Sequence, residues 1–297
     1  MNYSDALVSQ LFMLNQWEQD AAESQHISAH LQSYSIGAGA SPQVMQRNFV
    51  KILSLADTFY VSEEIADVLV GSFDTLPDGP LGDVRPSSPY GWVLFERPVV
   101  CPFETPQGEK WQVQALAWGP IPGGYEHSDD ALNICVFVHD YHHTRPLWDM
   151  PCVSMTVWPW IDGWDHWESD NDPDSANHKL SDWISKLTFS FFAFIRQECV
   201  SIQSQSASRP IRRHLPPSYS AEPVIKIIQL RRRSPATNGL EPQSRDYSCR
   251  WLVRGHWRNQ FYPSSKSHRP RFIPAYVKGP DDKPFKSTKS SVFAVVR

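Results

Sequence analysis

Hydrophobic positions recur every three or four residues in four parts of the chain, a pattern that predicts amphipathic helices. The strongest case is 180–200, where Leu180, Trp183, Leu187 and Phe191 fall on one helical face. The other three helices are predicted over 5–20, from Ser41-Pro42 to about Ala56, and from Ser62 to just before Leu76-Pro77. Ser62 precedes two glutamates, which is typical of the acidic first turn of a helix.

Between residues 78 and 160 the pattern changes to short β-branched and aromatic runs, separated by Pro, Gly and Asp. The runs lie at 90–95, 111–118, 132–138 and 153–158, and a further short β-prone run covers Thr58–Val61. This spacing predicts an antiparallel sheet. Helices followed by strands favour an α+β fold over a βαβ alternation, with N-terminal helices, a central antiparallel sheet and a C-terminal β-rich segment.

The expected organisation has three parts. Residues 1–200 form an α+β body, which is helical over 1–76, β-rich over 78–160 and helical again over 180–200. Residues 204–221 are rich in Ser, Arg and Pro and are predicted to be an exposed linker. Residues 222–297 form a basic β-rich module, with strands expected at 224–230, 249–258, 272–277 and 291–296.

The net charge differs strongly between the two ends of the chain. Residues 201–297 hold 19 of the 28 Lys and Arg but only 5 of the 32 Asp and Glu, a net +14 against −18 for residues 1–200. An asymmetry of this size indicates an anionic partner for the basic part, either nucleic acid or the acidic body of the same molecule.

The stretch from Cys249 to Arg258 alternates cleanly and predicts one continuous strand with a cationic face. Neighbouring positions on such a face lie about 6.6 Å apart, and phosphates of one DNA strand repeat about every 3.4 Å. Cations interleaved with aromatic rings are typical of single-strand binding sites. The candidate nucleic-acid-binding residues are Arg250, Arg254, His256, Arg258, Tyr262, Lys266, Arg269 and Arg271.

A resemblance to a known family also lies in this region. The segments WLVRGHWRNQFYPS (251–264) and HRPRFIPAYVKGPDDKPFK (268–286) resemble the C-terminal signature of a family of uncharacterised actinobacterial proteins. The earlier segment SPYGWVLFERP (88–98) and the helical N-terminus before it are similar to that family in their order along the chain and in their kinds of residue. The resemblance implies no activity, but it implies that the C-terminal module and the N-terminal body form one architecture.

A second candidate site is a cluster of metal-ligating residues. His139, His142 and His143 follow a predicted strand, and with an acid such as Asp149 they would suit zinc or manganese. The alternative is a polar loop with solvated histidines. The Asp-rich run 162–174 departs from a calcium loop, because it lacks the required Gly and the bidentate Glu.

The cysteine pattern and the apolar runs limit the classes of protein to which the chain can belong. Five scattered Cys with no C-x-x-C pair fit a reducing cytoplasm. The N-terminus lacks the positive n-region of a secretory signal, and no apolar run is long enough to span a bilayer. We therefore expect a soluble, cytoplasmic, tryptophan-rich protein without membrane contact and without a required cofactor.

Three functions fit the sequence. The first is a non-enzymatic nucleic-acid-binding accessory or regulatory protein, which uses the C-terminal basic and aromatic face. The second is a protein–protein interaction protein whose acidic and basic halves pair internally. The third is a hydrolase dependent on a divalent metal at the His139–His143 cluster, although no catalytic motif of known mechanism supports an enzyme.

Overall fold

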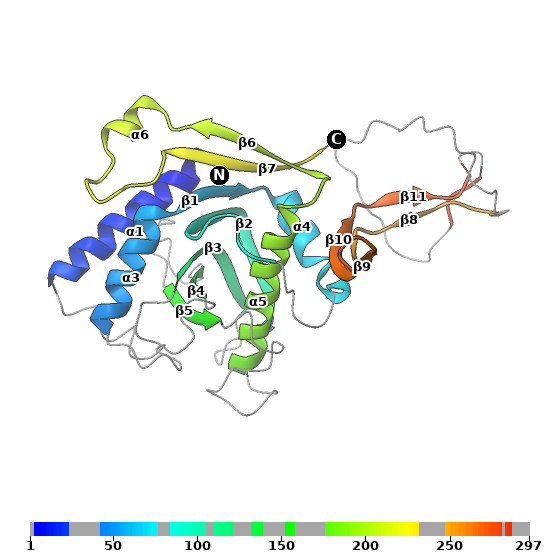
Figure 1. The fold of residues 1–297 in the computed structure, drawn as a ribbon, viewed down its shortest axis with the longest axis horizontal. Helices are drawn as coiled ribbons and strands as arrows, with labels where there is room; N and C mark the ends of the chain where they lie inside the picture. Colours follow the sequence, from blue (N-terminus) through cyan, green and yellow to red (C-terminus); the bar gives the residue numbers. More distant parts are fainter. Residues whose placement is uncertain are drawn as a thin grey trace.

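The computed structural model describes residues 3–23, 42–76, 84–104, 110–120, 132–138, 152–157, 176–231, 247–280 and 283–286. Its centre is a seven-stranded sheet with the strand order β5-β4-β3-β2-β1-β7-β6. Helices cover both faces of this sheet, and two small two-stranded sheets extend from one side (Figure 1). The fold is α+β, as the sequence predicts.

The sheet is mixed in its strand directions. The strands β2 to β5 form an antiparallel meander, as expected, whereas β1 runs parallel to both β2 and β7. The seven strands are β1 (Asp57–Val61), β2 (Gly91–Glu104), β3 (Lys110–Pro120), β4 (Leu132–Val138), β5 (Cys152–Val157), β6 (Val200–Ser206) and β7 (Val224–Leu230).

Two helices cover one face of the sheet. They are α1 (Ser4–Glu23) and α3 (Pro42–Leu55), and both match the expected helices. Their buried side chains, such as Leu7 and Ile52, pack with Trp92 and Phe137 of the sheet. Among the described helices, none combines the length and the hydropathy needed to cross a membrane.

The opposite face is covered by α4 (Glu63–Val70) and α5 (Ala176–Phe194). Aromatic rings dominate this side: Trp118 of β3 lies 5.0 Å from Phe192 and 5.7 Å from Phe59, measured between ring centroids. The strand β3 is buried on both faces, because Leu116 and Trp118 point to this layer while the alternate residues face α1 and α3. The continuous apolar run in the sequence reflects this two-sided burial.

Regular structure occurs within 204–221, the segment that is expected to be an exposed linker. Residues up to Ser206 belong to β6, which pairs along its length with β7, and a short helix α6 (Arg209–Arg213) lies between these strands. The strand β6 is an edge strand with mostly exposed side chains. Its Ser and Gln residues therefore give the polar pattern that is typical of a loop. The strand predicted at 224–230 is confirmed as β7, but it lies inside the main sheet.

The strand expected over 249–258 is divided in two. The strand β8 (Trp251–Val253) pairs with β11 (Tyr276–Lys278), and β9 (His256–Tyr262) pairs with β10 (Ser267–Ile273). The break falls at Arg254 and Gly255, where a Cβ on Gly255 would lie 2.8 Å from the Phe272 ring. The close approach of Phe272 therefore requires glycine at the point where the strand changes partner.

The β9–β10 hairpin is anchored to the body by two buried aromatic side chains. Trp257 and Phe272 stand opposite each other in the ladder and are each 4% exposed. The Phe272 ring lies 5.2 Å from that of Phe194, at the end of α5. The backbone N–H of Trp257 donates to Oγ1 of Thr75 at 2.8 Å. The hairpin thus shares the hydrophobic core of the body on its inner side.

Candidate functional site

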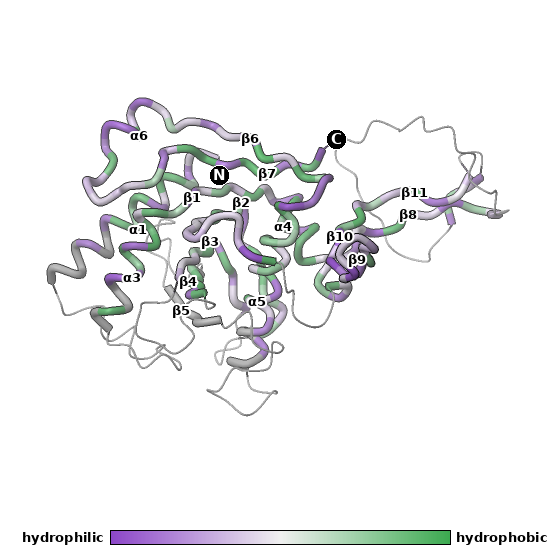
Figure 2. The backbone as a smooth tube through the Cα atoms, in the orientation of Figure 1, coloured by the Kyte–Doolittle hydropathy of each residue, from purple (hydrophilic) through white to green (hydrophobic). Residues whose placement is uncertain are grey.

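The β9–β10 register sorts the hairpin side chains into two faces. Because side chains alternate along a strand, the residues that alternate with Trp257 and Phe272 lie on the hairpin face opposite to these two residues. We call these residues the outer face: His256, Arg258, Gln260, Tyr262, Ser267, Arg269, Arg271 and Ile273. Five of the eight candidate nucleic-acid-binding residues are therefore brought onto one surface. Figure 2 shows the hydrophilic colouring of this hairpin beside the more apolar body.

The outer face concentrates positive charge within two rungs of the ladder. Arg258 stands directly opposite Arg271, and Arg269 is two residues further along β10. Arg271 forms an ion pair with Glu198 at 3.6 Å, but Glu198 is 93% exposed. An ion pair in such an open position is screened by water and contributes little. Arg258 is exposed, and no carboxylate among the described residues pairs with it.

The other three candidate residues lie elsewhere. Arg250 packs against the Phe285 ring, with its guanidinium carbon 4.2 Å from the ring centroid. Arg254 lies in the short connection between β8 and β9, and its carbonyl oxygen is 2.9 Å from Nδ1 of His256. Lys266 lies in the hairpin turn with a φ of 49°. The row of cations expected along one strand is thus replaced by a cluster on a two-stranded hairpin.

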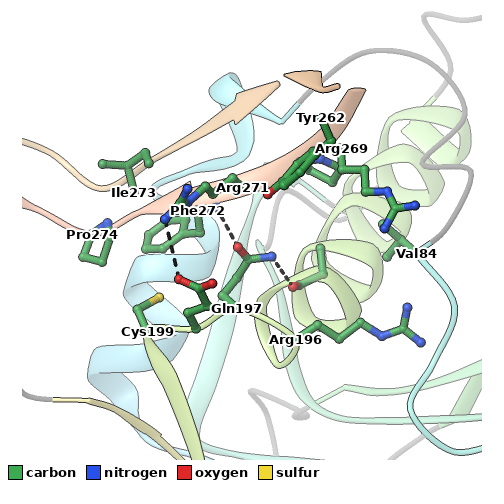
Figure 3. A pocket seen from close by; sticks show the side chains of 13 residues that line it. Val84, Arg196, Gln197, Cys199, Tyr262, Arg269, Arg271, Phe272, Ile273 and Pro274 are labelled. Atoms are coloured by element: carbon green, nitrogen blue, oxygen red, sulfur yellow. Dashed lines mark hydrogen bonds and ion pairs between the residues drawn. The ribbon is translucent and has the colours of Figure 1, made fainter. Parts of the chain in front are cut away.

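A pocket lies beside the outer face. It has a volume of about 380 Å³ and is bounded by β10, by the end of β9 and by the turn that joins α5 to β6 (Figure 3). The turn contributes Arg196, Gln197 and Glu198, and the hairpin contributes Tyr262, Arg269 and Arg271. Figure 3 shows Arg196 and Arg269 extending toward the same side of the pocket as Val84, with the Tyr262 ring beside Arg269.

Gln197 fixes the turn against the hairpin. Its side-chain Oε1 accepts the backbone N–H of Phe272 at 2.9 Å, and its Nε2 donates to the Ala193 carbonyl at 2.9 Å. The backbone N–H of Gln197 donates to Phe194 at 2.9 Å, which closes the end of α5. One side chain therefore joins the last turn of a helix to the strand that carries two pocket arginines.

The pocket includes residues that the sequence patterns did not indicate. Arg196, Gln197 and Glu198 were expected to lie at the end of a helix, and no periodic signal separated them from it. They meet β10 only because α5 ends at Phe194 and the chain turns there into an edge strand. The contact joins positions that are distant in the chain, such as Gln197 and Phe272, which are 75 residues apart.

The candidate metal cluster at His139, His142 and His143 lies outside the described residues, as does the acidic run 162–174. Within the described ranges, no group of three or more His, Cys, Asp or Glu side chains is arranged to hold a metal ion. The metal-dependent hydrolase therefore stays a prediction of the sequence.

Comparisons with known proteins find similarity among solved structures but no matching family model. No protein-family model matches the chain, and no curated protein matches it. Among solved structures, the chain is similar to the crystal structure of AcrVA2, with 13% sequence identity and a TM-score of 0.40. The alignment covers 92% of this chain and 95% of that chain. A TM-score at this level carries no argument about fold or function.

Proposed function

We propose that this protein is a non-enzymatic nucleic-acid-binding accessory or regulatory protein, which contacts single strands with the outer face of its β9–β10 hairpin. The observation that supports this function is the cluster of Arg258, Arg269 and Arg271 on one hairpin face, together with Tyr262. Guanidinium groups recognise phosphate oxygens in a bidentate manner, and an aromatic ring stacks on a base.

The spacing of the cluster suits a phosphate backbone. Arg269 and Arg271 are two residues apart on a strand, which is about 6.6 Å. Alternate phosphates of one strand are separated by about 6.8 Å along the axis, twice the rise of 3.4 Å per nucleotide. Arg258 lies across the ladder at roughly 5 Å between Cα atoms. Bound phosphates would relieve the repulsion between cations placed this close together.

Fluorescence anisotropy with labelled oligonucleotides tests the function in the full-length chain. We expect binding to a single-stranded 12-mer at low salt, with affinity falling as salt rises. For the three arginines of the cluster, the slope of log K against log salt is about −2, since each contributes about −0.7. We expect Arg258→Glu with Arg271→Glu, the opposed pair of the outer face, to weaken binding by at least about tenfold, because the charge of the surface is reversed locally.

A matched control comes from α6. Arg212 and Arg213 are exposed there and lie far from the hairpin (Figure 1), so Arg212→Glu with Arg213→Glu imposes the same change in net charge. Binding that is absent at 20 mM salt, or that falls equally in both double variants, would refute a specific role for the hairpin. Equal loss would indicate a nonspecific effect of net charge.

A second candidate function has one observation in its favour. Ion pairs between described residues of the basic third and of the acidic body include Lys226 to Asp57 at 2.6 Å and Arg271 to Glu198 at 3.6 Å. Such pairs are expected in an interaction protein whose oppositely charged halves associate internally. A double-mutant cycle on Asp57→Asn and Lys226→Met tests this function. A coupling energy near zero would remove its support.

A further inference from the structure

One edge of the seven-stranded sheet is formed by β6, and among the described residues this strand pairs on one side only, with β7 (Figure 1). We propose that two copies of the chain associate through this edge, so that β6 of one copy pairs antiparallel with β6 of the other. The two sheets then form one continuous sheet around a two-fold axis. This inference concerns self-association and does not depend on the nucleic-acid-binding function proposed above.

The backbone of β6 presents hydrogen-bonding groups to this edge. The backbone N–H of Arg231 donates to the Cys199 carbonyl at 2.8 Å, and that of Ala207 donates to the Pro223 carbonyl at 2.8 Å. Both bonds fit the register of the β6–β7 ladder, so the odd-numbered residues of β6 direct their N–H and C=O groups toward β7. The even-numbered residues direct theirs to the open edge, and beyond Val200 these are Ile202, Ser204 and Ser206. Among the described residues, no further backbone hydrogen bond involves these three.

The strand β6 lacks the features that commonly protect a sheet edge from pairing. Its sequence VSIQSQS contains no charged residue and no proline, and its register with β7 is regular from Val200 to Ser206. Ile202 is 42% exposed and lies on the same face of the sheet as Leu230, which is 39% exposed. An added strand covers part of this apolar surface while it satisfies the open backbone groups.

The charges at the two ends of β6 favour a second copy over an unrelated peptide. Glu198 lies two residues before the strand and is 93% exposed. Arg209 lies three residues after the strand, is exposed, and has no ion pair among the described residues. In an antiparallel pair centred on Gln203, Glu198 of each copy is level with Ser208 of the other, next to Arg209. Opposite charges therefore meet at both ends of the contact.

The contact covers one strand of each copy, which makes the association weak. Seven residues of strand span about 23 Å, and one added strand covers less than the roughly 1,600 Å² of a standard protein interface. We therefore expect a dimer that forms with rising concentration. At the low micromolar concentrations of an oligonucleotide titration we expect monomers, so that α6 of one copy does not approach the hairpin of another.

Sedimentation velocity of the full-length chain from 2 to 200 µM tests the association. We expect the mean mass to rise over this range from that of one chain toward that of two. Ser204→Pro should weaken the association at least about tenfold, because proline removes an outward N–H and places its ring at the edge. Ser204→Ala is the matched control, which keeps that N–H and should associate like the wild type. A monomer at 200 µM, or equal association of the two variants, would overturn the proposal.

A mixing experiment at 50 mM salt tests whether the arrangement is two-fold. Glu198→Arg alone places like charges at both ends of the pair, as does Arg209→Glu alone, so each should associate about tenfold more weakly than the wild type. Mixed one to one, the two variants restore opposite charges at both ends, and association should return to within about twofold of the wild type. Neither substitution alters the backbone of β6, so this test stands even if Ser204→Pro unfolds the chain. Association that stays weak in the mixture would overturn the two-fold pairing.

Discussion

Arg258 and Arg271 face each other across the β9–β10 ladder, so that two guanidinium groups occupy directly opposed positions of one hairpin. Like charges in opposed positions destabilise a strand pair. The cost is roughly 0.2–1 kcal/mol, similar in size to the stabilisation that an opposite-charge pair provides. The hairpin tolerates this repulsion because its other face is anchored by Trp257 and Phe272. The arrangement is expected where an anion is bound.

Arg258→Gln should therefore stabilise the unliganded protein while weakening oligonucleotide binding. We expect an increase in the free energy of unfolding of about 0.2–1 kcal/mol at 20 mM salt. The increase should shrink at 300 mM salt, where the repulsion is screened. Thermal denaturation at both salt concentrations measures this. A variant that is less stable than the wild type at low salt would contradict the repulsion.

Trp257→Ala should detach the hairpin from the body. Trp257 is 4% exposed and packs on Phe272 at 5.2 Å between ring centroids, so its truncation leaves a large cavity. The expected cost is about 3–5 kcal/mol, measured by urea denaturation. Leu252→Ala is the control, because Leu252 is 53% exposed and its loss should change stability by less than about 0.5 kcal/mol. Equal effects of the two substitutions would contradict the anchoring role.

Gln197→Ala should loosen the pocket without reaching the main core. The substitution removes the acceptor of the Phe272 N–H, which costs about 1–3 kcal/mol for a polar group left without a partner. Hydrogen exchange at the Phe272 amide should become faster. Gln197→Glu is the discriminating control, because it keeps an oxygen acceptor for that amide. Equal exchange rates in the two variants would show that the hydrogen bond is not what protects the strand.

Tyr219 makes stability depend on alkaline pH. Burial, assisted by the nearby charge of Asp57, raises the pKa of Tyr219 to about 12, although a hydrogen bond with Thr58 acts in the opposite direction. The folded state therefore holds this proton more tightly than the unfolded state, whose tyrosine titrates near pH 10. The stabilisation is complete below pH 10 and is lost as the pH rises through about 12.

Tyr219→Phe should reduce this alkaline loss. Between pH 10 and 12, we expect the free energy of unfolding of the variant to fall less steeply than that of the wild type. The two slopes should differ by about 1.4 kcal/mol per pH unit. Some alkaline sensitivity should remain, because burial and Glu96 also raise the pKa of Tyr60. Urea denaturation at pH 9.5, 10.5 and 11.5 measures the slope. An unchanged slope would show that the Tyr219 proton is not linked to folding.

The helices and most strands were predictable because their signals are local. The apolar face of 180–200 and the β-branched runs at 111–118 and 132–138 each identify an element from its own residues, and α5, β3 and β4 confirm them. The edge strand β6 was not predictable, because an exposed strand paired on one side needs no alternation of apolar residues. Its partner β7 was recognisable as a strand but not as a member of the main sheet.

For the candidate site, the sequence determined which residues are candidates, since the charge and ring content of 254–271 are properties of the side chains themselves. Only the tertiary structure decided which of them lie together. The break at Gly255 and the hairpin turn at Lys266 place Arg271 opposite Arg258, and the end of α5 places Arg196 beside β10. Such proximity depends on where distant segments pair and pack, and alternation within a single strand holds no information about its partner.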